Sequence, residues 1–380
     1  MKAFEGFKVS LTGFFFLPTQ KIFTLLRTLV FTVYLYGAEL WSPFVLRSLI
    51  QEKAFRWLLG LAKGQHRRLL GWIQVMPPDV EALGRVVKTM CEARKDDGLL
   101  KEAISQFVLN AVTEGTHETR SSSDLWLKLS VTKIRQVWPA FAVSMGDPDG
   151  EGQRSLIIDG IPADIADGSP KVISSAFCHA LMFIQIREHF SAILSNAPGC
   201  NQQQYVLWHI LRRLPPEHDS PLFPHPPRCP HYQFQDVIRL LSGTMDFARV
   251  HAHYVYRKQY GDFPESLKRA CLLCAARNLD RQDAPMDSEW HMLFGCPITE
   301  TAREQYKNFI SAEFSQFHLM WDPTVESLSG HIIRIREFPS LFDHFARFLS
   351  RCLSARHQAL RRLKAEDIRT LLRVTQNPTC

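Results

Sequence analysis

Hydrophobic positions recur at helical spacing through most of this chain, whereas the alternating pattern of half-buried strands is scarce. The clearest case opens at Pro77, Pro78 and Asp79 and runs out near Gly98. Further helices are predicted at 99–112, 173–196 and 203–213, and one more is expected to end near Met145. The pattern therefore predicts a mainly α-helical fold, with a multi-helix body and long loops.

An apolar stretch at 22–41, IFTLLRTLVFTVYLYGAELW, approaches the length of a membrane span. Arg27 lies in its middle, and Lys21 and Glu39 bracket only 17 residues. Because a charge is costly at the centre of a bilayer, we interpret the stretch as a buried amphipathic helix. A second helix is predicted to start at Ser42, where Ser and Pro form a typical helix start.

Three polar or proline-rich segments interrupt this pattern. Residues 116–124, THETRSSSD, form a candidate linker, and 146–171 form a loop with room for one short hairpin. Prolines cluster at 214–230, where they prevent a helix from continuing, so this segment is interpreted as irregular and on the surface.

Composition limits the function classes. A chain of 380 residues that is 46% hydrophobic can bury a sizeable core. The net charge of +7 permits a nucleic-acid or anionic-membrane partner without requiring one. Nine cysteines are too sparse for a disulfide scaffold in a chain of this length, so reduced thiols and an intracellular location, nucleus or cytoplasm, are expected. Glu5 and Pro18 interrupt a signal-peptide pattern, so secretion is not expected.

The strongest candidate chemistry lies at 271–297, CLLCAARNLDRQDAPMDSEWHMLFGCP. Cys271 and Cys274 are followed, after 16 residues, by His291 and Cys296. Two closely spaced ligand pairs joined by a polar loop are typical of a tetrahedral structural zinc site, so these four residues are the predicted Zn²⁺ ligands. A redox role for the CxxC pair is less favoured, because no strand-turn-helix pattern surrounds it.

A second possible cluster comprises His225, Cys229 and His231. It offers only three candidate ligands and no paired partner, so we interpret it as part of an ordinary surface loop.

The blocks CLLC, DSEWHMLFGCP and TAREQYKNF together resemble the C-terminal cysteine–histidine knuckle of non-LTR retrotransposon reverse transcriptases. That family has an acidic residue before the histidine and a hydrophobic ending that closes on Cys-Pro. The matching positions are Glu289, Leu293, Phe294, Cys296 and Pro297. The resemblance implies a CCHC zinc knuckle whose ligands fall on Cys271, Cys274, His291 and Cys296.

A second block, LLRTLVFTVYLYGAELWSPF, resembles the stretch that follows the polymerase palm in the same family, with its YGxExW signature at Tyr36, Gly37, Glu39 and Trp41. The likeness covers about 20–320 and implies an order of regions. These are an N-terminal apolar helical segment at 1–35, a thumb-like region at 36–115, a helical spacer at 116–260, the zinc-knuckle region at 261–320 and a basic helical tail at 321–380.

Catalysis by such a polymerase requires paired carboxylates that hold two metal ions. The Asp-Asp pair of this chain, Asp96 and Asp97, lacks flanking strand residues and follows the YGAELW block instead of preceding it. We therefore expect no catalytic residues and no enzyme activity in the chain as it stands, and the resemblance places the palm upstream of residue 1. Two alternatives remain open: part of an active RNA-directed DNA polymerase with its palm upstream, or a structural, protein-interaction zinc protein.

Arginines and lysines greatly outnumber acids between 331 and 373, alongside an apolar stripe at helical spacing. One interpretation is a phosphate-contacting surface for nonspecific RNA or DNA binding, and the other is a solvated basic helix packed on the body. Trp290 and Phe294 are candidates either for stacking on bases or for burial in the knuckle. Neither a small-molecule substrate nor a membrane partner is expected. The candidate phosphate contacts are Arg347, Arg351, Arg361, Arg362 and Lys364.

Overall fold

The computed structural model describes the chain in segments and is mainly α-helical, as predicted. Its described residues are 13–41, 57–60, 76–95, 98–113, 122–148, 154–195, 210–214, 228–243, 245, 247, 270–277, 285–313, 325–335 and 338–363. The elements are α2 (Thr19–Leu26), η1 (Arg27–Phe31), α3 (Thr32–Tyr34), α4 (Ala38–Trp41), α6 (Pro78–Lys95), α7 (Leu99–Thr113), α8 (Ser122–Ile134), β1 (Ala142–Pro148), β2 (Arg154–Asp159), α9 (Pro170–Leu194), α11 (His231–Ser242), α14 (Leu272–Arg277), η5 (His291–Gly295), η6 (Pro297–Thr299), α15 (Glu300–Glu313), α16 (Val325–Ile335) and α17 (Pro339–Arg362).

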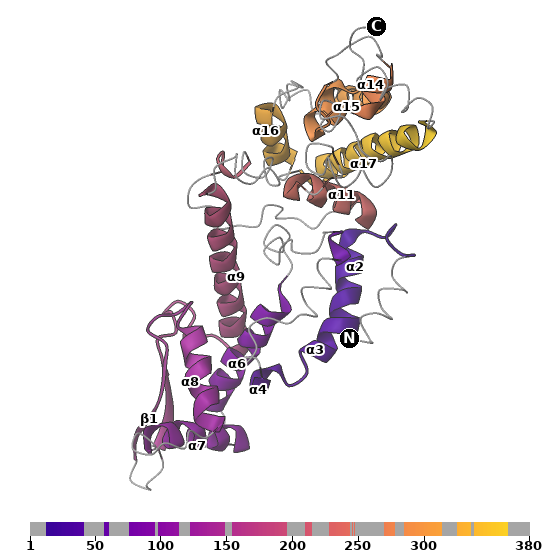
Figure 1. Ribbon diagram of the computed structural model, residues 1–380. Coiled ribbons are helices and arrows are strands. Elements are labelled where there is room, and N and C mark those ends of the chain that lie inside the picture. The colour runs from indigo at the N-terminus through magenta and orange to yellow at the C-terminus, as the bar shows by residue number, and fades with distance from the viewer. Residues whose placement is uncertain are drawn as a thin grey trace, which may run out of the picture.

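Among the described residues, buried side chains gather into two large hydrophobic cores. Core 1 surrounds Phe141 and Phe177 and is built from α6, α7, α8, the β-hairpin and the first half of α9. Core 2 surrounds Phe234 and Phe345 and is built from the N-terminal helices, α11, α15, α16 and α17. The long helix α9 runs from the region of α6 and α8 towards that of α11 and α16 (Figure 1), and its buried residues join both cores.

The helices with the strongest sequence signals form close to their predicted bounds. α6 begins at Pro78, with Asp79 and Glu81 in its first turn and Arg94 and Lys95 in its last. These charges complement the helix dipole at both ends. α7 and α9 likewise cover the predicted 99–112 and most of 173–196. The helix predicted from Ser42 lies largely outside the described residues.

The helix expected to end near Met145 is a misassignment, because α8 ends at Ile134 and Met145 belongs to strand β1. Pro139 explains the early stop, since proline and the residue before it resist helical geometry. β1 pairs with β2 in antiparallel register, Met145 opposite Leu156, and forms the short hairpin for which the sequence left room. Leu156 and Ile158 point into core 1.

The N-terminal apolar stretch buries one face in core 2, as an amphipathic helix should. Ile22, Leu26 and Phe31 are buried, whereas Arg27 is exposed. The helix is interrupted after α3, where Gly37 adopts a positive φ of 62° that allows the turn into α4. Within the described residues, no helix combines the length and apolar character needed to cross a membrane.

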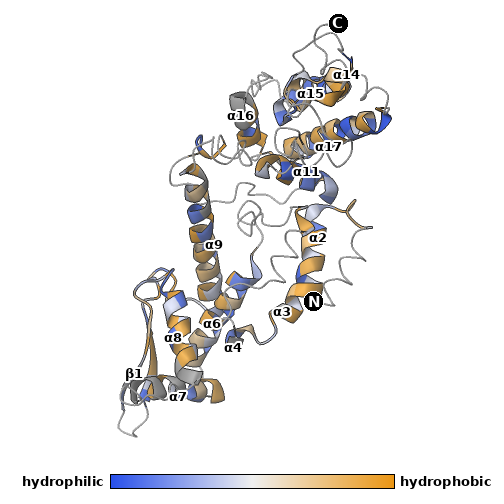
Figure 2. Ribbon diagram, in the orientation of Figure 1, coloured by the Kyte–Doolittle hydropathy of each residue, from blue (hydrophilic) through white to orange (hydrophobic). Residues whose placement is uncertain are grey.

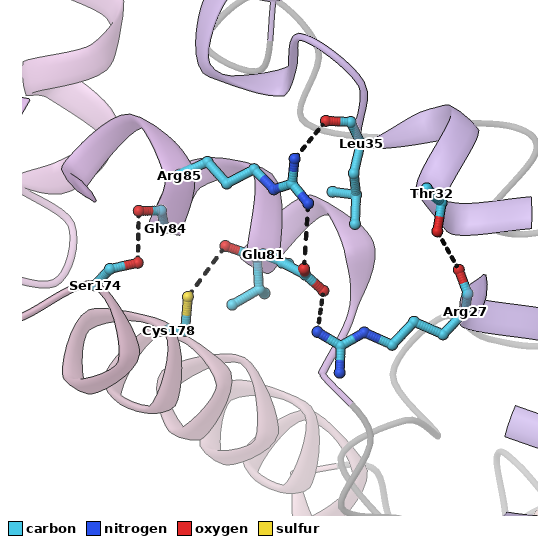
Figure 3. A network of polar contacts seen from close by, with 9 residues as sticks. Arg27, Thr32, Leu35, Glu81, Gly84, Arg85, Ser174 and Cys178 are labelled. Carbon is cyan, nitrogen blue, oxygen red and sulfur yellow. Dashed lines mark hydrogen bonds and ion pairs between the residues drawn. The ribbon is translucent and has the colours of Figure 1, made fainter. Parts of the chain in front are cut away.

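A polar network fastens this N-terminal segment to α6 (Figure 3). Glu81 lies between two arginines, 3.1 Å from Arg27 Nη2 and 3.7 Å from Arg85 Nη2. Arg85 also donates to the Leu35 carbonyl at 2.9 Å, so it caps the end of α3. The N-terminal helices and α6 are therefore joined by hydrogen bonds and ion pairs as well as by apolar packing.

On its other side α6 approaches α9 closely at Gly84. Ser174 Oγ on α9 donates to the Gly84 carbonyl at 2.7 Å, and Cys178 Sγ lies 3.6 Å from the Val80 carbonyl. A Cβ built on Gly84 would lie 2.2 Å from Cys178 Sγ, which is an impossible contact. Glycine is therefore required for this helix crossing.

A buried hydrogen-bond ladder on α11 joins it to 57–60. Since a carbonyl only accepts, His231 Nε2 must donate to the Leu58 carbonyl, 2.6 Å away. Gln235 donates to the same carbonyl at 2.8 Å, and Arg239 donates to that of Gly60 at 3.2 Å. Three side chains, each one turn further along α11, thus satisfy carbonyls at a helix end.

Replacing Gly84 by Ala is expected to destabilise the protein by about 1–3 kcal/mol, because the added methyl forces α6 and α9 apart. Urea unfolding provides the measurement. Gly13→Ala is the matched control, since nothing lies within 4 Å of a Cβ there. Adding Cys178→Ala should recover part of the loss, and equal stability of both Ala variants would contradict the packing account.

Acidification is expected to destabilise the fold through two buried histidines. Burial lowers the pKa of His231 and of His331 to about 4 in each case, since a charged imidazole loses its hydration inside core 2. The folded pKa lies below the unfolded value of about 6.5, so stability is fully present above pH 6.5 and is lost as the pH falls towards 4. Each histidine contributes a loss of roughly 3 kcal/mol at most.

Urea unfolding between pH 7 and pH 4 measures this loss. His231→Gln, which keeps a donor for the Leu58 carbonyl, should show a shallower pH dependence than the wild type. The exposed His179 on α9 serves as the control, and His179→Gln should keep the wild-type dependence. An unchanged pH dependence in His231→Gln would refute the assignment.

Candidate metal centre

The four predicted ligands are presented by two tight backbone turns. Cys271 directly precedes α14, which carries Cys274, and the N–H groups of Cys274 and Ala275 both donate to the Cys271 carbonyl, at 3.1 and 2.9 Å. His291 opens η5, and the Cys296 N–H closes that turn by donating to the His291 carbonyl at 2.6 Å. Each pair of ligands is therefore positioned by hydrogen bonds within its own turn.

The ligand atoms of Cys271, Cys274, His291 and Cys296 all lie within 4.8 Å of one another, so the group could hold a metal ion. Cys274 Sγ is 4.0 Å from Cys296 Sγ and 3.2 Å from His291 Nε2. A tetrahedral site with ordinary zinc bond lengths separates two sulfurs by about 3.8 Å, and a sulfur from a nitrogen by about 3.6 Å. The donor set and its spacing thus fit a tetrahedral metal site.

The electrostatics of the cluster also suit a cation. Hydrogen bonds from Cys271 and Cys274 lower the pKa of the Cys296 thiol to about 3. The hydrogen bonds that Cys274 makes with Cys271 and Cys296 raise the pKa of the Cys274 thiol. Cys296 is therefore the thiol that ionises first, and the Cys274 thiol keeps its proton, because thiolates this close together among the three buried sulfurs repel one another. A bound cation would remove this repulsion and allow all three to ionise.

A small apolar cluster supports the two ligand-bearing turns, 270–277 and 285–299, which we call the knuckle. Leu273 and the three cysteine ligands pack together, and Ile298 and the last turns of α17 cover them. The Cys271 N–H donates to the Pro285 carbonyl at 2.8 Å, and Thr299 Oγ1 donates to the Cys296 carbonyl at 3.0 Å. Apolar contacts therefore hold the knuckle to α17, and the two hydrogen bonds hold the knuckle itself together.

A buried ion pair strengthens that attachment. Arg356 Nη1 and Nη2 donate to the two carboxylate oxygens of Asp287 at 2.6 and 2.7 Å, and the side chains are 4% and 0% exposed. The guanidinium also lies over the Phe247 ring, 5.0 Å from its centroid. Such a bidentate pair fixes orientation, and loss of one partner typically costs about 3–5 kcal/mol.

The sequence did not single out Arg356 or Asp287 for this role, although a signal exists. Arg356 continues the buried stripe of Phe345, Leu349 and Cys352 at helical spacing. A charge in a core stripe requires a buried partner, and an acid beside the metal ligands is a natural candidate for it.

The four described candidates for phosphate contact, Arg347, Arg351, Arg361 and Arg362, are exposed on α17. At 100° per residue they fall within a sector of about 100°, whereas Arg356 lies on the opposite side. We call these four residues the basic stripe. Figure 2 shows hydrophilic residues gathered at the C-terminal end of α17. Arg351 also donates to Gln305 Oε1 at 2.7 Å.

The other sequence candidates have varied positions. Trp290 and Phe294 are half-buried and pack against core 2. Lys364 lies outside the described residues, as do Asp96 and Asp97.

The interpretation of His225, Cys229 and His231 as a surface loop is wrong for its second half. His225 lies outside the described residues, but Cys229 and His231 are buried. Asp343 Oδ1 accepts from the Cys229 N–H at 2.9 Å, and His231 is engaged in the α11 ladder. Cys229, at the end of the proline-rich segment, is therefore part of core 2, and polar partners satisfy both its N–H and the imidazole of His231, which opens α11.

No protein-family model, curated protein or solved structure matches this chain.

Proposed function

We propose that this chain binds RNA or single-stranded DNA without sequence specificity, through the basic stripe of α17, and that a structural zinc ion holds the adjoining knuckle. The observation that carries the proposal is the double role of α17, whose exposed face bears the stripe while its last turns cover the metal ligands. The resemblance of the knuckle to that of non-LTR retrotransposon reverse transcriptases supports the same function.

Zinc is the metal that suits the donor set best. Thiolates and imidazole are its preferred ligands in structural sites, whereas calcium and magnesium require oxygen. Cys271, Cys274, His291 and Cys296 would fill all four tetrahedral positions. Since no position would remain for water or substrate, the ion would serve as a scaffold and not as a catalyst.

The basic stripe supplies the chemistry for phosphate. Each guanidinium offers a planar set of donors that matches a phosphate, and Arg347 and Arg362 lie about 22 Å apart along the helix. Contacts of this kind neutralise the backbone and carry no sequence information. Binding should therefore depend steeply on salt and weakly on sequence.

Purified protein is expected to contain one zinc ion, and Cys274→Ser or His291→Ala should abolish it, because a tetrahedral site with three protein ligands binds far more weakly. Elemental analysis measures the zinc content. Cys178→Ser is the matched control, since Cys178 is a buried thiol distant from the knuckle in sequence and able to keep its bond to the Val80 carbonyl as serine. Absence of zinc, or equal zinc in all variants, would disprove the assignment.

Changing Arg347, Arg351, Arg361 and Arg362 together to Gln should weaken binding to oligouridine RNA. The slope of log affinity against log salt should fall by about 2.8, at about 0.7 for each lost phosphate contact to a single strand. Fluorescence anisotropy titrations at several salt concentrations give the slope.

The control variant removes the same charge from the elements around core 1, by changing the exposed Arg94, Lys128, Arg154 and Lys171 to Gln. It should keep most of the wild-type slope. If both variants lose the same amount, binding follows net charge and the stripe has no special role. If neither loses any, α17 is a solvated helix.

A further inference from the structure

The helix α17 rests on two different supports. Its first half is held by core 2, where Phe345, Leu349 and Cys352 are buried. Tyr306 stacks on Phe348 in the same half, with ring centroids 4.6 Å apart. Its last turns have a second support, because Ala359, Leu360 and Leu363 pack against the cluster of Leu273 and the three cysteine ligands.

The basic stripe is divided in the same way. Arg347 and Arg351 lie on the half that core 2 holds, whereas Arg361 and Arg362 lie on the turns that cover the knuckle. All four share one face only while the helix continues without a break to Arg362.

Asp287 is placed by the knuckle itself. It lies between the two ligand pairs, after Pro285, whose carbonyl accepts from the Cys271 N–H. It precedes Ser288, whose Oγ accepts from the His291 N–H at 3.3 Å. The Asp287 carboxylate that accepts from Arg356 therefore lies in a segment that is hydrogen-bonded to both ligand pairs, at Cys271 and at His291. Its position depends on the two ligand pairs staying together.

We infer that metal occupancy controls the second half of the basic stripe, with Arg356 as the positioning residue that couples the two. With metal bound, the Asp287–Arg356 pair holds 356–362 as helix and all four arginines lie on one face. Without metal, the ligand pairs separate, the buried pair loses its geometry, and 356–363 loosens while 341–352 stays folded on core 2. The consequence for nucleic acid rests on the proposed function, whereas the coupling within the protein does not.

Hydrogen exchange of the full-length protein, with zinc and after chelation, tests the coupling directly. Chelation should remove amide protection from 356–363 and leave that of 341–352 and of α9 unchanged, because only the last turns depend on the knuckle. Unchanged protection of 356–363 would overturn the inference. So would loss of protection along all of α17, since the helix would then behave as one unit.

The variant Asp287→Asn distinguishes the effect of the Asp287–Arg356 ion pair from the effect of the metal. The amide cannot match the charge of Arg356, but all four ligands remain, so zinc content should stay at the wild-type level while 356–363 loses protection even with zinc bound. Asp343→Asn is the matched control, because it neutralises an acid on the first half of the same helix. It should leave the exchange of 356–363 unchanged. If Asp287→Asn does not fold, the comparison of wild-type protein with and without zinc still decides the matter.

Binding to oligouridine gives the second readout. Chelation should lower the salt slope by about 1.4, equal to two phosphate contacts at about 0.7 each. Arg361→Gln with Arg362→Gln should lower the slope by the same amount with zinc and add nothing without it, whereas Arg347→Gln with Arg351→Gln should lower it in both states. Equal effects of the two pairs in both states would refute the coupling. If oligouridine does not bind at all, the proposed function fails, and the exchange measurement alone judges the inference.

Discussion

The buried ion pair between Arg356 and Asp287 is the interaction on which the candidate site depends. Both charges have left water, so each requires the other, and the bidentate geometry allows only one relative orientation of α17 and the 285–290 segment. A purely apolar contact would hold these elements together but would tolerate sliding. The pair therefore contributes direction more than free energy, and it gives the four candidate metal ligands a fixed position on the helix.

The basic stripe follows from the same constraint. Burying Arg356 sets the rotation of α17 about its axis, and at 100° per residue this rotation directs Arg347, Arg351, Arg361 and Arg362 outwards. Phe345, Leu349 and Cys352 enforce the same rotation nearer the N-terminus of α17. One helical phase thus determines that Arg356 is buried and that the four arginines of the stripe are exposed.

The sequence predicts the parts of this protein that are encoded locally. Pro78 and Asp79 mark the start of α6 without reference to any other element, and each ligand pair of the knuckle spans only one turn. Met145 was misassigned because the apolar residues that follow Pro139 fit a helix or a strand equally well, and their pairing with β2 decides between the two. Cys229 and His231 were misplaced for a similar reason. Their polar partners, Asp343 and the Leu58 carbonyl, are more than 100 residues distant in the chain, so nothing near them in sequence indicates burial.

The small size of the knuckle explains why four candidate metal ligands and a buried charge occur together there. Its apolar cluster consists of Leu273 and three cysteines, with Ile298 and the end of α17 around them. This cluster buries little apolar area, although Met292 and Leu293 of the second turn are buried in core 2. Small units of this kind generally need a metal or a covalent link to offset the entropy lost on ordering. Binding of a metal would supply the missing free energy, and only in the ordered knuckle does Asp287 meet Arg356. Stability of the knuckle and the position of the last two arginines of the stripe are then two consequences of one binding event.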